Sequence, residues 1–179
     1  MSYKEYHPPH IYFDDTIYFI TSRTVNKEKF FATNAQKNIL YSCLKAGLQK
    51  FKIPIYAFAI LDNHYHLMIR LSKAGDLPLF IKHLNGRSSF ELNKLENKPG
   101  RKIWYQYFDR CIRDQVDFWR HFNYIHNNPV KHGQCRNLAE AESYPFSSAG
   151  KWVKIKGEEW WLGCFREYPI VDFTAVSKD

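Results

Sequence analysis

Hydrophobic and polar residues follow two different periods along this chain, and these periods predict where strands and helices lie. Apolar or β-branched runs predict strands over residues 17–21, 53–61, 64–71 and 103–112. Apolar positions at helical spacing predict helices from 33 or 34 to about 50, from about 77 to 95 and from about 115 to 127. We expect the last helix to stop before Pro129, because the residue before a proline disfavours the helical backbone.

The order strand, helix, strand, strand, helix, strand, helix predicts the fold class. The simplest arrangement is an α+β fold, a ferredoxin-like split β-α-β unit with a four-stranded antiparallel sheet, followed by one more helix. The turn signal Asp62-Asn63 predicts a hairpin between the second and third strands. We expect residues 1–135 to form one domain and residues 136–179 to form a C-terminal tail whose aromatic side chains pack on that domain.

Composition narrows the class of partner. The chain has 179 residues, a formal net charge of +8 and 17% aromatic residues, which favours a polyanionic partner. No apolar run approaches the roughly 18–20 residues of a membrane helix. The first residues lack the apolar core of a signal peptide. Without such a run or signal peptide, we expect no contact with a membrane. The four cysteines are far apart and form no Cys-x-x-Cys pair, so we expect free thiols in a reducing cytoplasm.

The predicted strand over 64–71 carries the first candidate chemistry. Its alternation places His64 and His66 on one face, and Tyr65 with Leu67 on the face toward a core. Two imidazoles side by side, with open positions beyond them, form a layout typical of a catalytic metal site. The alternative is a pair of histidines that are merely surface-exposed or satisfied by neighbours on the strand.

The last predicted helix carries the second set of candidate catalytic residues. On a helical wheel, Tyr124 lies away from the apolar stripe, and Asn128 follows one turn later. A phenol is a weak nucleophile at neutral pH, but it becomes useful against a phosphodiester that a metal polarises. Tyr124 is therefore a candidate nucleophile, and Asn128 a candidate third metal ligand. The alternative is an ordinary tyrosine on an amphipathic helix and an asparagine that ends that helix.

Together these motifs resemble the single-tyrosine HUH transposases of small insertion sequences, and especially their REP-associated relatives. The resemblance rests on His64-Tyr65-His66 and on the run from Tyr124 to Lys131, which reads Tyr-Ile-His-Asn-Asn-Pro-Val-Lys. It covers about residues 10–135. The chain departs from the family pattern at two positions. Asn128 stands where the insertion-sequence branch usually has glutamine, and His132 stands where small residues are common.

The resemblance implies a metal-dependent endonuclease and strand transferase acting on single-stranded DNA beside a hairpin. It implies that Tyr124 forms a 5′-phosphotyrosine link, and that His64, His66 and Asn128 hold Mg²⁺ or Mn²⁺. It leaves open whether the protein acts as a monomer or as a homodimer. Basic residues expected to meet DNA phosphates are Arg120, Lys131, Arg101, Lys102 and Arg110. Tyr105 or Tyr107 could stack on unpaired bases.

Two rival functions stay open at this point. A basic antiparallel sheet with exposed aromatic residues is also typical of RNA-recognition domains, so the chain could be a non-catalytic nucleic-acid-binding module. A hydrolytic nuclease could use the same histidines with water as the nucleophile. Replacing Tyr124 by phenylalanine separates these possibilities, because only the tyrosine mechanism requires the hydroxyl.

Overall fold

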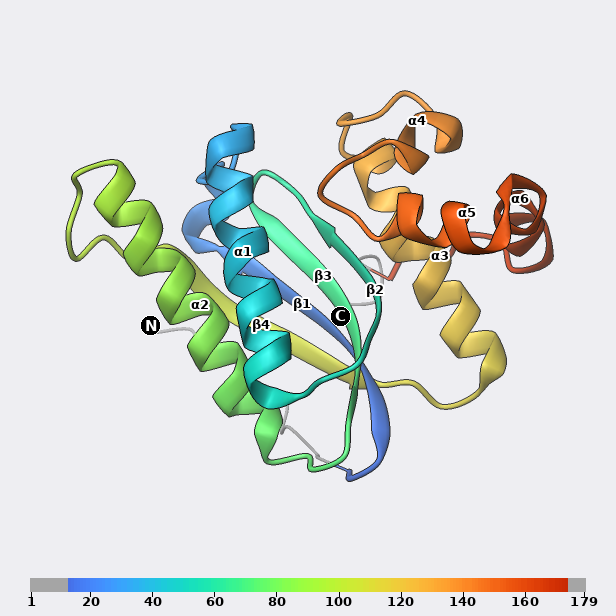
Figure 1. Ribbon diagram of the computed structural model, residues 1–179, viewed down its shortest axis with the longest axis horizontal. Helices are drawn as coiled ribbons and strands as arrows, with labels where there is room; N and C mark the ends of the chain where they lie inside the picture. Colours follow the sequence, from blue (N-terminus) through green and yellow to red (C-terminus); the bar gives the residue numbers. More distant parts are fainter. Residues whose placement is uncertain (1–12, 174–179) are drawn as a thin grey trace, which may run out of the picture.

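The computed structural model describes residues 13–173, and its elements follow the predicted order (Figure 1). The strands are β1 (Thr16–Thr24), β2 (Ile55–Ile60), β3 (His64–Leu71) and β4 (Trp104–Cys111). The helices are η1 (Val25–Lys27), α1 (Asn34–Phe51), α2 (Asp76–Leu95), α3 (Gln115–Lys131), α4 (Leu138–Glu142), α5 (Ala149–Lys156) and α6 (Glu158–Glu167).

The four strands form one antiparallel sheet in the order β2-β3-β1-β4, which confirms the predicted α+β fold class. The central pair, β1 and β3, sets the register of the site, because Thr21 lies opposite His66 and Arg23 lies opposite His64. Residues that face each other across strands point to the same side of the sheet. Thr21 and Arg23 therefore share a face with the two histidines.

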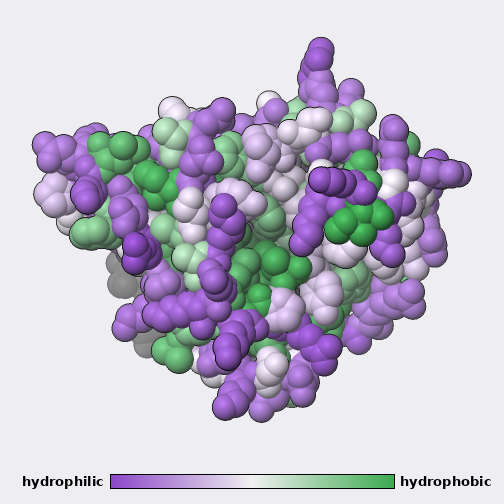
Figure 2. Space-filling model, in the orientation of Figure 1, coloured by the Kyte–Doolittle hydropathy of each residue, from purple (hydrophilic) through white to green (hydrophobic). Residues whose placement is uncertain are grey.

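Helices α1 and α2 cover the other face. The Thr33 hydroxyl accepts a hydrogen bond from the Gln36 backbone amide, and the Gln36 side-chain oxygen accepts one from the Thr33 backbone amide. This capping box starts α1 where the sequence predicts. Its buried residues pack with α2 and with one face of β3, including Tyr65 and Leu67. Figure 2 shows this side of the molecule, where hydrophilic side chains surround green patches of exposed apolar residues.

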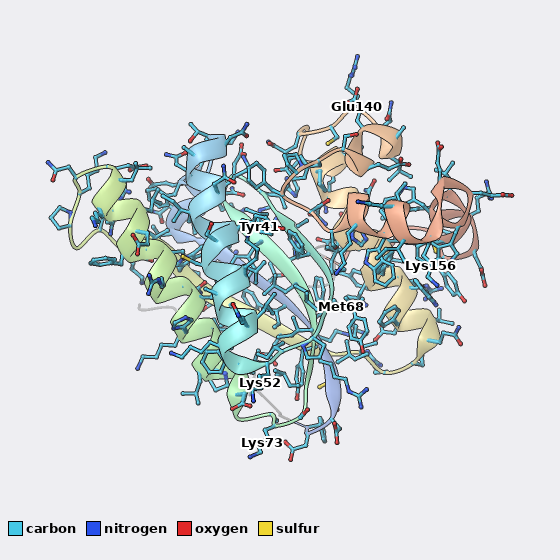
Figure 3. The ribbon with its side chains drawn as sticks, viewed as in Figure 1. Tyr41, Lys52, Met68, Lys73, Glu140 and Lys156 are labelled. Atoms are coloured by element: carbon cyan, nitrogen blue, oxygen red, sulfur yellow. The ribbon has the colours of Figure 1, made fainter. Side chains whose placement is uncertain are left out.

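Helix α3 lies against the face that carries the histidines, close to β2 (Figure 1). Met68, labelled in Figure 3, packs there with Phe122 and Ile125. The predicted end of this helix was wrong, because α3 continues through Pro129 to Lys131. Proline lacks an N–H donor, but so near the end of the helix it removes a single intrahelical hydrogen bond.

The tail contains three short helices where the sequence suggested no regular elements. Trp161 of α6 is fully buried against the α3 side chains Phe122 and His126. Asn123 of α3 donates hydrogen bonds to the carbonyls of Cys164 and Tyr168, at 2.8 and 2.7 Å. The tail thus packs on α3, while the domain boundary at residue 135 remains a prediction.

Two simpler expectations concern cysteines and membranes. All four cysteines are free, as predicted. None of the helices between residues 13 and 173 is long and apolar enough to cross a membrane.

Candidate active site

The two histidines of β3 lie next to each other, with ring centroids 4.9 Å apart. His66 is almost fully buried and His64 is half-buried. Opposite His66, the Thr21 hydroxyl lies 2.7 Å from its Nδ1 atom. A hydroxyl can donate to or accept from that nitrogen, so Thr21 suits either tautomer of His66. When Nδ1 carries the proton, Thr21 accepts its hydrogen bond and Nε2 keeps the lone pair that a metal would use.

The neighbouring Asn63 determines which ring nitrogen of His64 carries the proton. The Asn63 Nδ2 amide donates to the backbone carbonyl of Lys27 at 2.9 Å, which fixes the orientation of the Asn63 side chain. Its Oδ1 atom then faces His64 Nδ1 at 2.7 Å. An amide oxygen only accepts, so His64 donates from Nδ1 and keeps the lone pair on Nε2. This is the tautomer that binds a metal through Nε2.

Asn128 joins α3 to the histidines. Its Oδ1 atom lies 3.1 Å from His66 Nε2, although the two residues are 62 positions apart. Its Nδ2 atom donates to the Tyr124 backbone carbonyl at 2.7 Å, which aims the oxygen at β3. The helical spacing of Tyr124 and Asn128 therefore places an amide oxygen beside the imidazoles.

Tyr124 lies at the same place, with its ring centroid 5.2 Å from that of His66. The prediction that Tyr124 lies away from the apolar side of α3 was wrong, because its exposed fraction is 2% and it packs in one cluster with Phe122 and Ile125. Burial raises the pKa of its hydroxyl above the ordinary value; a hydrogen bond with Asn128 opposes this rise, and the carboxylate of Asp172 adds to it. In this conformation the phenol is fully protonated at neutral pH.

The end of the described tail covers Tyr124. The ring of Phe173 packs edge-on against Tyr124 at 5.2 Å and stacks on His121 at 3.9 Å. Asp172 accepts a bond from Lys131 Nζ at 2.9 Å, and that ammonium lies 5.4 Å from the Tyr124 ring. A helical wheel drawn for α3 alone cannot show this cover, since the covering residues follow more than forty positions later.

Burial also keeps the site histidines neutral. It lowers the pKa of His64 to about 4, to which nearby His132 contributes, and it lowers the pKa of His66 well below the ordinary value. Neutral imidazole is the form that binds metals. In residues 13–173, no three side chains of His, Cys, Asp or Glu are arranged to hold a metal ion. Among these residues, the Asn128 amide oxygen is the candidate third donor beside the two imidazoles.

This donor set fits a divalent cation. Two imidazole nitrogens and one amide oxygen lie on one side of the sheet. Asn63 fixes the tautomer of His64, the Tyr124 carbonyl fixes the orientation of Asn128, and Thr21 lies beside His66. Such a set leaves coordination positions for a substrate oxygen or for water.

The predicted DNA-binding residues are not equivalent in the structure. Arg101 pairs with Glu96 at 2.6 Å, and Arg110 lies 3.4 Å from Asp117. Lys131 flanks Tyr124 but is paired with Asp172, while Arg120 is exposed on α3. Lys102 lies 5.8 Å from the Tyr105 ring.

Three residues of the site escaped the sequence analysis. Thr21 could be found only once the register of β1 and β3 is known. Asn63 was assigned only to the turn. The ring of His132, at the end of α3, lies 4.7 Å from that of His64. Its position two helical turns after Tyr124 was a signal, which the expected helix end before Pro129 concealed.

Comparisons with known proteins show the family of the chain. The family model described as "Transposase IS200 like" matches residues 13–128. A Haemophilus influenzae (strain ATCC 51907 / DSM 11121 / KW20 / Rd) protein with the provisional name REP-associated tyrosine transposase is 30% identical over 156 residues, 80% of this chain and 86% of its own. The REP-associated tyrosine transposase of Escherichia coli (strain K12) is 24% identical over 133 residues, 73% and 74% of the two chains.

The fold has a counterpart among solved structures. A REP-associated tyrosine transposase bound to a REP hairpin superposes with a TM-score of 0.69 at 20% identity, covering 83% of this chain and 86% of that one. At this identity, the superposition shows the fold. The chain belongs to the IS200-like transposases, an enzyme family, and its relatives place it with the REP-associated tyrosine transposases.

Proposed function

We propose that this protein is a metal-dependent endonuclease and strand transferase that nicks single-stranded DNA beside a hairpin and forms a 5′-phosphotyrosine link through Tyr124. One observation carries this proposal: Tyr124 and Asn128 of α3 lie against His66 of β3, at 5.2 Å between rings and 3.1 Å between Oδ1 and Nε2. A binding module has no need for a buried tyrosine beside paired neutral imidazoles and an amide oxygen.

In the proposed step, the Tyr124 oxygen attacks the phosphorus of a DNA phosphodiester. A phosphorus–oxygen bond to Tyr124 forms, and the bond from phosphorus to the 3′-oxygen of the preceding nucleotide breaks. The phenol loses its proton, and the released 3′-oxygen gains one. The phosphodiester energy remains in the phosphotyrosine bond, so a second 3′-hydroxyl can reverse the step and join strands without ATP.

His64, His66 and Asn128 are the residues that would hold Mg²⁺ or Mn²⁺. Such an ion supplies Lewis-acid stabilisation of the charge that develops on the phosphate. The chain itself contributes the fixed tautomer of His64, the hydroxyl of Thr21 beside His66, and the positive charge of Lys131 beside Tyr124.

The hairpin substrate follows from the relatives. A similar solved structure is described as bound to a REP hairpin, so we propose a palindromic DNA hairpin with a single-stranded flank as the substrate. We place the protein in the cytoplasm, where its thiols stay reduced. The family resemblance predicts either a monomer or a homodimer.

An adduct assay tests the proposal. End-labelled single-stranded oligonucleotides with imperfect palindromes from the flanks of the gene are incubated with Mn²⁺, Mg²⁺ or EDTA and run on denaturing gels. We expect a metal-dependent band of covalent protein–DNA adduct, which Tyr124→Phe abolishes. The matched control is Tyr41→Phe, because Tyr41 lies on α1 at the other side of the sheet (Figure 3).

The rival functions give different gels. Cleavage without adduct that survives in Tyr124→Phe identifies a hydrolytic nuclease. Binding without cleavage on every palindrome identifies a non-catalytic module. Either result overturns the proposal.

A further inference from the structure

The face of the sheet that carries the histidines is covered unevenly. Within residues 13–173, helix α3 packs over β2 and β3, reaches β4 at Arg110 through Asp117, and leaves Phe108 of β4 exposed. There Phe108 lies opposite Thr21, and Gln106 lies opposite Arg23. Since Thr21 bonds to His66, this uncovered surface begins directly beside the candidate metal site.

Phe108 is unusual on this surface because its side chain is 39% exposed on a strand whose other face is packed. The guanidinium of Arg23 lies 5.6 Å from its ring and 5.1 Å from the ring of Tyr105. Beside them, a cavity of about 460 Å³ is lined by Arg23, Thr24, Asn26, Lys27 and Tyr105. We call Arg23, Tyr105 and Phe108 the aromatic strip.

Within the described residues, the positive charge of Arg23 has no carboxylate partner. Across the described part of the chain, no carboxylate forms an ion pair with Arg23 or Lys102, whereas Arg101 and Arg110 are each paired. Unpaired cations beside exposed aromatic rings are the combination that binds single-stranded nucleic acid, with phosphates at the cations and bases stacked on the rings. A duplex offers no free base faces for such stacking.

We infer that the aromatic strip binds the single-stranded DNA that leads from the hairpin to Tyr124, with a base stacked on Phe108 and a phosphate held by Arg23. Arg23 follows Thr21 by two residues, a distance of about 7 Å along a strand. A nucleotide on the strip would therefore neighbour the phosphodiester at His66. This inference rests on the proposed function, because it assigns the strip to the substrate of that site.

Measuring DNA binding under conditions that prevent cleavage tests the inference. Fluorescence anisotropy in EDTA, where no cleavage is expected, compares a DNA hairpin that has a single-stranded extension with the same hairpin without one. We expect Phe108→Ala and Phe108→Leu to weaken binding of the extended hairpin about tenfold or more, because both remove the flat ring. Phe108→Trp should restore it. Binding of the hairpin without extension should change little.

Matched controls and a spectroscopic readout separate stacking from folding. Phe90→Ala removes another exposed phenylalanine, 66% exposed on α2, and should leave both affinities unchanged. A 2-aminopurine in the extension should be quenched on binding to the wild type and less so with Phe108→Ala. Arg23→Ala should lower the slope of log affinity against log salt by about 0.7, one phosphate contact with a single strand.

The possible outcomes distinguish failure of the inference about the aromatic strip from failure of the proposed function of Tyr124. If Phe108→Ala weakens both hairpins equally, or no more than Phe90→Ala does, the inference is overturned even if Tyr124 forms its adduct. Equal binding of an RNA extension overturns the assignment to DNA. If no adduct forms but the extension still depends on Phe108, the strip stands and the proposed function falls.

Discussion

The two faces of the sheet bury polar groups in different ways. On the α1 and α2 face, two buried donors have partners: Lys37 Nζ donates to Asp62 at 2.6 Å, and Trp104 Nε1 donates to Ser88 at 3.0 Å. On the α3 face, His121 Nε2 and Asn123 Oδ1 are buried and have no hydrogen-bond partner within the described structure. A buried unsatisfied polar atom costs about 1–3 kcal/mol.

This difference indicates that the two faces of the sheet have different roles. The α1 and α2 face is a closed core that stabilises the sheet and fixes the register of β1 and β3. The α3 face buries imidazoles, amides and a phenol, some of them without a hydrogen-bond partner among the described residues, at a cost in stability. Changes on one face should therefore affect stability, and changes on the other should affect chemistry.

The largest expected effect comes from the metal ligands. His66→Ala should lower the rate of adduct formation by at least about 100-fold, because it removes a proposed ligand of the ion that stabilises the charged phosphate. Mn²⁺ affinity, measured by electron paramagnetic resonance, should fall in parallel. His83→Ala on α2 is the control, and an equal loss there would refute the division between the faces.

A core truncation should give the opposite pattern. Leu44 of α1 is almost fully buried, so Leu44→Ala should lower the free energy of unfolding by about 2–5 kcal/mol. Urea denaturation measures this loss. Adduct formation per folded molecule should stay unchanged, and a proportionate loss of activity would show that the faces are not independent.

Asn123→Ala tests the join between α3 and the tail. It leaves the carbonyls of Cys164 and Tyr168 without their donor, so the free energy of unfolding should fall by about 1–3 kcal/mol. Limited proteolysis should then cut near α6 first. Uniform protection of α6 in the variant would contradict this role.

The smallest effect is expected at Phe173. Phe173→Ala uncovers Tyr124, so the burial that raises the pKa of this phenol weakens and adduct formation should rise, by less than about tenfold. Ile170→Ala, at an exposed position of the same segment, is the control. An unchanged or lower rate with Phe173→Ala would show that Phe173 does not obstruct the site.

Sequence periodicity predicted the order of strands and helices because each of these elements has its own local signal. The β3 alternation placed Tyr65 and Leu67 in one core and His66 on the other side, as the structure shows. Pro129 misled the analysis because a local rule on proline was applied at a helix end, where one lost hydrogen bond is tolerated.

The surroundings of the site depended on contacts between distant segments. Thr21 is a partner of His66 only through strand register, and Phe173 covers Tyr124 only through the path of the tail. No periodicity within a single element encodes such contacts. The reactive groups were therefore readable from the sequence, while their burial and their supporting hydrogen bonds were not.

One measurement tests the central claim most directly: mass spectrometry of the trypsin-digested protein–DNA adduct. Cleavage after Arg120 and Lys131 releases a peptide in which Tyr124 is the sole tyrosine. The account predicts that this peptide carries the nucleotide through a phosphotyrosine bond, and only when Mn²⁺ or Mg²⁺ is present. A nucleotide on any other tyrosine, or cleaved DNA with no modified peptide, would contradict it.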